Sequence, residues 1–156
     1  MKTIAFLGHR RIVNIKEVKE NMINVLTSVL NQGVSRVLIG CHGDFDWLAL
    51  KTCLEFKKEN NFDFKIYIVL TSVSFLNKGK SGKSLASIYQ DMGCETTFYD
   101  IEDVYYKNRI TYSNKKMIDE SDLIICCVDM SAYQSGAKTA VKYALRKKKE
   151  IINLFI

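Results

Sequence analysis

The stretch Thr3-Ile4-Ala5-Phe6-Leu7-Gly8-His9-Arg10 joins a short, continuously apolar run to a glycine and two polar side chains. Runs without polar alternation are typical of strands in a parallel sheet that helices cover on both faces. Five further runs rich in isoleucine, valine or aromatic residues follow along the chain, at residues 37–39, 66–70, 97–99, 123–128 and 151–155. The sequence therefore predicts a mostly parallel sheet of about six strands.

Helical periods lie between these runs. The clearest one gives residues 15–30 a single apolar face, formed by Ile15, Val18, Met22, Leu26, Val29 and Leu30. Gly33 and Gly93 follow two of the predicted helices, at the place where glycine commonly ends a helix. Further helices are predicted at residues 50–54, 85–92, 110–118 and 137–145. This alternation predicts a three-layer, Rossmann-like α/β sandwich with right-handed crossovers.

The composition is typical of one soluble domain. The 156 residues are 47% hydrophobic and 26% charged, with no proline, and we expect a single domain over residues 1–156. The longest apolar run is too short to span a membrane, and the first one is too short for a signal peptide. We therefore expect a cytoplasmic protein without a membrane partner. The five cysteines are odd in number and lack C-x-x-C spacing, so we expect neither a metal nor a cofactor.

The net charge of +6 is concentrated in two places. The larger cluster has no acid within it and consists of Lys138, Lys142, Arg146, Lys147, Lys148 and Lys149; the smaller one consists of Lys78, Lys80 and Lys83. Such clusters attract phosphate or nucleic acid, but a solvated helix face and a surface loop explain them as well. We expect no aromatic side chain to stack within the larger cluster, which counts against single-stranded nucleic acid. The segment 77–84 is similar to a P-loop, but Asn77 replaces its first glycine, so we interpret it as a flexible basic loop.

The loops after the strands hold the candidate site, because ligands of parallel α/β sheets bind beyond the carboxyl ends of the strands. After the first strand, Gly8 would allow close approach of a ligand. His9 and Arg10 would donate hydrogen bonds to a phosphate or carboxylate. A surface histidine and a surface salt bridge explain the same two residues equally simply.

The loop after the second strand, residues 40–46, suits a sugar phosphate. Gly40 and Gly43 would provide space and N–H donors for the phosphate. Asp46 would accept hydrogen bonds from ribose hydroxyls or act as a general acid or base. Both Asp44 and Asp46 also fit the role of a helix N-cap, and the two interpretations stay open.

After the fifth strand, Ser135 and Gly136 precede a helix that begins near Ala137. Ser135 would bind a phosphate together with the N–H groups that follow it, or would act only as the N-cap. No G-x-G-x-x-G fingerprint is present, which argues against a standard NAD site. If the amides near Gly8, Gly43 and Gly136 surround one pocket, the ligand predicted on physical grounds is a small molecule that carries a phosphate.

Four blocks of sequence, at residues 3–10, 40–46, 107–122 and 135–144, occur in an order that resembles the SLOG superfamily of Rossmann-like domains, and within it the YpsA-like branch. The resemblance implies a nucleotide or nucleotide-derived ligand held between the three loops, and commonly a homodimer. It also implies a ligand contact for Asn108 and Arg109, whose guanidinium would pair with a phosphate.

Relatives in that superfamily differ in activity. Among these relatives, the cytokinin-activating phosphoribohydrolases cleave N-glycosidic bonds with the help of a glutamate in their glycine-rich motif. The corresponding position in this chain is Ala140. We therefore rank a nucleotide-binding or sensing domain without turnover first. Hydrolysis of a nucleoside monophosphate with Asp46 as the acid or base is the alternative. DprA-like nucleic-acid binding is a second alternative.

Overall fold

The computed structural model describes residues 2–156 and contains one six-stranded sheet. Its strands are β1 (Lys2–Gly8), β2 (Val34–Ile39), β3 (Lys65–Val69), β4 (Glu95–Thr97), β5 (Leu123–Cys127) and β6 (Glu150–Asn153). All neighbouring strands pair in parallel, in the order β4-β3-β2-β1-β5-β6. The predicted Rossmann-like α/β fold is confirmed.

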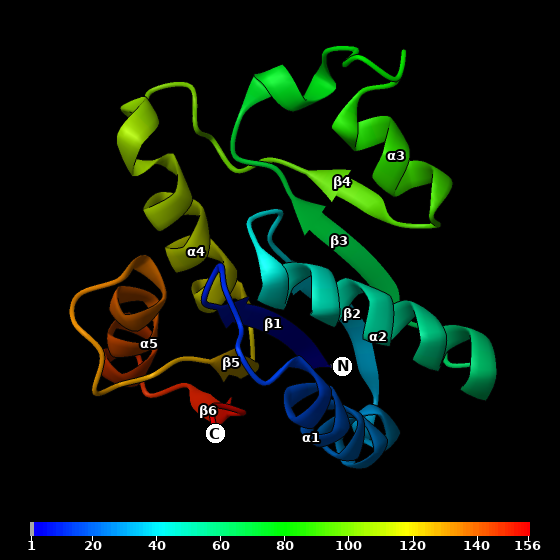
Figure 1. Cartoon of the computed structure of the whole chain (residues 1–156), viewed down its shortest axis with the longest axis vertical. Coiled ribbons are helices and arrows are strands. Elements are labelled where there is room, and N and C mark those ends of the chain that lie inside the picture. Colours follow the sequence, from blue (N-terminus) through cyan, green and yellow to red (C-terminus); the bar gives the residue numbers. More distant parts are fainter. Residues whose placement is uncertain (1) are drawn as a thin grey trace.

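Helices cover both faces of this sheet (Figure 1). They are α1 (Ile15–Val29), α2 (Asp44–Asn60), α3 (Leu85–Asp91), α4 (Arg109–Glu120) and α5 (Gly136–Arg146), with short 3-10 turns η1 (Leu30–Gln32), η2 (Val73–Leu76) and η3 (Tyr106–Asn108). One buried cluster joins α1 and α2 to the sheet, and a second joins α4 and α5 to its other face. No helix in the described part of the chain is both long and apolar enough to cross a bilayer.

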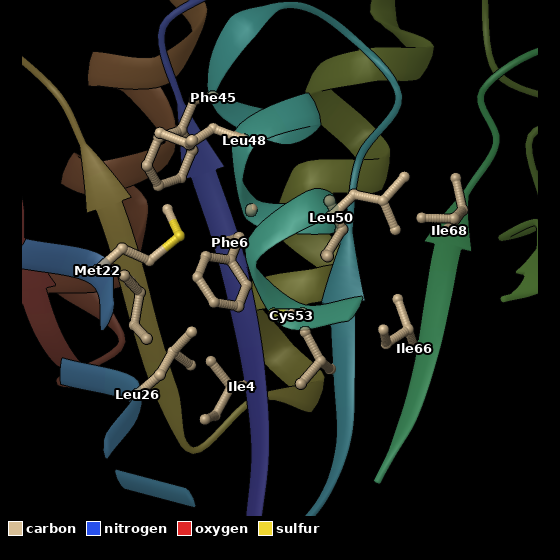
Figure 2. Close-up of a cluster of buried hydrophobic side chains, with 14 of the residues drawn as sticks. Ile4, Phe6, Met22, Leu26, Phe45, Leu48, Leu50, Cys53, Ile66 and Ile68 are labelled. Atoms are coloured by element: carbon tan, nitrogen blue, oxygen red, sulfur yellow. The ribbon is translucent and has the colours of Figure 1, made fainter. Parts of the chain in front are cut away.

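Strand β1 divides the core between the two faces, because successive side chains of a strand point in opposite directions. Ile4 and Phe6 lie in the cluster with α1 and α2, whereas Ala5 and Leu7 lie in the cluster with α4 and α5. Figure 2 shows Phe6 between side chains of α1, α2 and β3. All four β1 residues are nearly inaccessible to solvent, which explains why this run carries no polar alternation.

Two predicted boundaries differ from the structure. The fourth strand comes before residues 98 and 99, because backbone pairing with β3 places Glu95 opposite Tyr67 and Thr97 opposite Val69. The second helix begins at Asp44, before the apolar period at residues 50–54 that predicted it and at one of the two acidic residues that the N-cap interpretation placed at its start. The segment 77–84 is a loop, as predicted, and an antiparallel bridge between Lys78 and Ser84 closes it.

The strand order fixes where a ligand can enter. Strand β1 pairs with β2 on one side and with β5 on the other, so the chain leaves the carboxyl ends of β1 and β5 in different directions. In open α/β sheets this reversal of strand order creates a crevice at the carboxyl edge. The loops that follow β1, β2 and β5 meet there.

Candidate functional site

A cavity of about 430 Å³ lies at this crevice, within the size range of small-molecule sites. Seven of the predicted site residues line it: Gly8, His9, Arg10, Gly40, Asp46, Ser135 and Gly136. The other four predicted residues, Gly43, Asp44, Asn108 and Arg109, are not part of its lining. Loops from three strands and the first turn of α5 therefore share one cavity.

Arg10 brings a positive charge to the cavity. Its side chain forms no ion pair with any residue between 2 and 156. The guanidinium acts on two neighbours, because its charge contributes to lowering the pKa of His42 and opposes the rise in the pKa of Asp46. An arginine without a carboxylate partner is suited to bind a phosphate.

His9, which follows β1, connects the end of that strand to the end of β5 at the crevice. Its backbone N–H donates to the Cys127 carbonyl at 3.2 Å, and its Nε2 accepts a hydrogen bond from the Asp129 N–H at 2.9 Å. Because Nε2 is occupied as an acceptor, only Nδ1 is left to donate to a ligand. The ring therefore holds the loop after β5 in place.

Two glycines of the cavity wall are required by the packing of the protein itself. A Cβ at Gly8 would lie 2.4 Å from Cγ of Phe45, and a Cβ at Gly40 would lie 2.7 Å from Oδ2 of Asp46. Gly8 thus lets α2 approach β1, and Gly40 makes space for a carboxyl group.

Gly43 and Gly136 differ in the space available for a Cβ atom. Gly43 has a φ of 99°, and its Cβ would lie 2.4 Å from Cα of Arg10, so it sets the contact between two loops. A Cβ at Gly136 would meet no atom within 4 Å. Nothing in the packing of the described residues requires glycine at position 136, which faces the cavity.

Asp46 is the titratable group of greatest interest. Its Oδ2 accepts a hydrogen bond from the His42 N–H at 2.9 Å. Burial raises its pKa to about 7, against the opposing effects of that hydrogen bond and of Arg10. A carboxyl group that changes charge near neutral pH can donate to or accept from a ligand hydroxyl, and it can serve as an acid or base.

Asp44 plays a different part from Asp46. Its Oδ2 accepts a hydrogen bond from the Ile12 N–H at 3.0 Å, and its own N–H donates to the Arg10 carbonyl at 2.7 Å. These two bonds connect the start of α2 to the first loop.

Ser135 is the N-cap of α5. Its Oγ accepts a hydrogen bond from the Lys138 N–H at 3.1 Å, as the capping interpretation predicted. Ser135 also lines the cavity together with Gly136 and Ala137. Since the first N–H groups of a helix have no intrahelical partner, the positive end of α5 is open to an anion.

Four polar residues that the sequence analysis did not select also line the cavity: His42, Thr71, Ser113 and Asn114. His42 Nε2 lies 2.7 Å from Thr71 Oγ1, and burial together with Arg10 lowers its pKa, so the ring is neutral at physiological pH.

A signal for Ser113 exists in the sequence. With Ile110 and Met117 it forms the i, i+3, i+7 spacing of a buried helix face, where a serine is out of place.

Asn108 and Arg109, which the family resemblance selected at the start of α4, lie outside the cavity lining. Arg109 Nε donates to the Val104 carbonyl at 3.0 Å, and Asn108 is the exposed N-cap of α4. Ala140, at the position of the expected glutamate, is 4% exposed and packs in the core beside α4. Within residues 2–156, Asp46 is the carboxylate that the cavity wall contains.

No family model and no curated protein matches the chain. Among solved structures, it is similar to DNA processing protein A from Helicobacter pylori, a structure described for its single-stranded DNA binding mode. The TM-score is 0.65 at 18% sequence identity, and the match covers 97% of this chain and 64% of that one. This chain thus spans just under two thirds of that protein. The similarity establishes the fold, while the SLOG superfamily, its YpsA-like branch and the homodimer stay predictions.

Proposed function

We propose that the chain binds a nucleotide or a nucleotide-derived phosphate in the cavity at the carboxyl edge of the sheet. One observation carries the proposal: an arginine without an ion-pair partner, Arg10, and the first turn of α5 line the same cavity. Guanidinium groups and helix N-termini both bind phosphate well.

A ligand larger than phosphate fits the rest of the lining. A cavity of about 430 Å³ exceeds what a bare phosphate fills, and its other polar groups include Thr71, Ser113 and Asn114. Uncharged donors and acceptors of this kind recognise hydroxyl groups and the edges of bases. The phosphate of a nucleotide would thus contact Arg10 and α5, with its nucleoside against these polar groups.

Binding without turnover is our first choice. The buried Ala140 leaves no glutamate at the position used by the phosphoribohydrolases. Hydrolysis stays an alternative because Asp46, with a pKa near 7, lines the cavity. Release of free base from AMP, GMP, CMP or UMP by the wild-type chain would favour hydrolysis.

The variant Gly136→Ala tests the binding site directly. We expect it to weaken binding of nucleoside monophosphates about 10-fold, because a methyl group would stand where a phosphate approaches the helix N-terminus. Stability should be unchanged or slightly higher, since the Cβ meets no protein atom. Calorimetric titration with the four nucleotides and with inorganic phosphate measures the effect.

Gly79→Ala is the matched control. Its Cβ would meet only the Lys83 carbonyl at 3.6 Å, an ordinary contact, and Gly79 lies outside the cavity lining. Equal nucleotide affinity of the two variants, or no binding by the wild-type chain, would contradict the proposed function.

A second candidate function is nucleic-acid binding on the surface of α4 and α5. The sequence analysis expected no aromatic residue within the basic cluster, and the structure corrects this. The Tyr143 ring has Lys115 Nζ at 5.5 Å, Arg146 Cζ at 5.8 Å and Lys147 Nζ at 5.5 Å from its centroid. Basic groups around an aromatic ring are typical of surfaces that bind single strands. The similar protein from Helicobacter pylori is described as binding single-stranded DNA.

This surface is separable from the cavity. Tyr143 lies about 10 Å along the helix axis from Gly136 and is not part of the cavity lining. We expect the triple variant Lys147→Glu/Lys148→Glu/Lys149→Glu to weaken binding of a fluorescent oligo(dT) and to reduce its salt dependence by about two in the logarithmic slope. Its affinity for mononucleotides should be unchanged.

The control for this test changes the net charge equally on the opposite face. Lys16, Lys51 and Lys58 are exposed residues of α1 and α2, and their replacement by glutamate should leave the slope almost unchanged. If both triple variants lose oligo(dT) affinity to the same extent, the binding is nonspecific attraction and this second candidate is wrong.

A further inference from the structure

Ser113 lines the cavity, and its hydroxyl group has no hydrogen-bond partner among residues 2–156. Ser113 is 1% exposed, and its Oγ forms no hydrogen bond with any of residues 2–156. Buried hydroxyl groups in native proteins are nearly always bonded, so an exception of this kind requires a reason.

Other buried hydroxyls on helices of this chain are satisfied. A serine or threonine within a helix can bond to the carbonyl four residues earlier. Thr52 does so with Leu48 at 2.7 Å, and Ser121 does so with Met117 at 2.6 Å. Ser113 makes no such bond to Arg109, so its donor and its lone pairs stay free at the cavity.

The surroundings of Ser113 determine which kind of group could satisfy it. Ile110 and Met117 flank it on α4, and Leu7 and Val69 contribute apolar side chains to the same cavity. A hydroxyl group among apolar side chains cannot compensate for the desolvation of an ionised phosphate. It can bond well to a hydroxyl group, an amide or a ring nitrogen.

We propose that Ser113 is a specificity-determining residue that bonds to an uncharged polar group of the nucleoside, a ribose hydroxyl or the edge of the base. This inference rests on the proposed function and adds to it the orientation of the ligand. The nucleoside lies against α4, and the phosphate lies at Arg10 and the start of α5. Thr71 and Asn114, which line the same cavity, would complete the uncharged part of the site.

The variant Ser113→Ala separates a ligand contact from a structural role. We expect it to weaken binding of AMP, GMP, CMP or UMP, whichever the wild-type chain binds, by about 5- to 10-fold. The affinity for inorganic phosphate should be unchanged. Without ligand, the midpoint of thermal unfolding should rise by a few degrees, because an unsatisfied hydroxyl is removed and alanine favours the helix.

Ser121→Ala is the matched control, because this serine, the C-cap of α4, is equally buried but already bonded. It should lower the unfolding midpoint and leave nucleotide affinity unchanged. Comparing each nucleotide with its 2′-deoxy and 3′-deoxy forms shows which group Ser113 contacts: a Ser113 effect that is lost with either deoxy form assigns the contact to that ribose hydroxyl, and one that is kept with both assigns it to the base.

Four results would overturn the inference. If Ser113→Ala binds nucleotides as the wild-type chain does, Ser113 makes no contact, although the proposed function stands. If it weakens nucleotide and phosphate equally, or if it lowers the unfolding midpoint, its role is structural. If the wild-type chain binds no nucleotide at all, the inference and the proposed function fail together.

Discussion

Replacing Gly43 by alanine is expected to lower the free energy of unfolding by about 3 kcal/mol or more, because strain and a backbone contact act together. Gly43 has φ 99° and ψ −170°, a region that is almost exclusive to glycine. The added Cβ would lie 2.4 Å from Cα of Arg10 and 2.8 Å from its carbonyl oxygen. Backbone atoms cannot move aside as a flexible side chain can, so the two loops must separate.

Gly93→Ala isolates the contact from the strain. Gly93 has a similar φ of 92°, but its Cβ would meet nothing within 4 Å, so only the cost of holding alanine at a positive φ applies, about 1 kcal/mol. Urea unfolding of both variants at one pH measures the difference. A loss in Gly43→Ala no larger than that in Gly93→Ala would show that the approach of the two loops is not a constraint.

The same substitution should also affect the ligand. The start of α2 holds the first loop through Gly43 and through the bonds of Asp44 to Arg10 and Ile12. Although neither Gly43 nor Asp44 lines the cavity, both determine where Arg10 lies. The sequence analysis predicted a ligand contact for these two residues, and the geometry supports a positioning role instead.

The fold could be predicted because its signals are local. Strand β5 is buried over its whole length, and a run of this kind is recognised without knowing its neighbours. Strand β4 shows the limit. The aromatic residues Phe98 and Tyr99 predict a strand, but the pairing with β3 determines where the strand lies. This pairing ends at Thr97.

The site could be predicted only in part, because its geometry depends on contacts between distant segments. The loops of Arg10, Asp46 and Ser135 were found because each follows a strand. Thr71 follows β3 and offered the same signal, but it was not selected. Ser113 was missed because its spacing indicates only a buried helix face, and the fold is needed to show that this face borders the cavity. On α4, Arg109 was selected by resemblance, but the polar residues on the cavity wall are Ser113 and Asn114, about one helical turn later.

Asp46→Asn is expected to stabilise the protein, by about 2 kcal/mol more at pH 8 than at pH 5. The pKa of Asp46 is raised from 3.8 to about 7 in the folded chain, so between these values the folded state binds more protons than the unfolded state. The wild-type chain therefore loses stability as the pH rises through this range, whereas asparagine has no charge to bury. The asparagine carbonyl can still accept the hydrogen bond from the His42 N–H.

Urea unfolding of both chains at pH 5 and pH 8 measures this gain. Asp63→Asn changes an exposed carboxylate outside the cavity and should alter stability by less than about 0.5 kcal/mol at either pH. A stability difference between Asp46→Asn and the wild-type chain that does not grow with pH would show that Asp46 is ionised without penalty.

Stabilising substitutions commonly cost function where a site needs a group that destabilises the protein. If Asp46 serves the ligand, Asp46→Asn should be the more stable protein and also the weaker nucleotide binder. The loss should be larger at pH 8, where the wild-type carboxylate is ionised and accepts hydrogen bonds from ligand hydroxyls. Gly40 gives the Asp46 carboxyl its space. Stabilisation without any loss of binding would mean that Asp46 accepts no hydrogen bond from the ligand, and the ribose-binding role of Asp46 would be wrong.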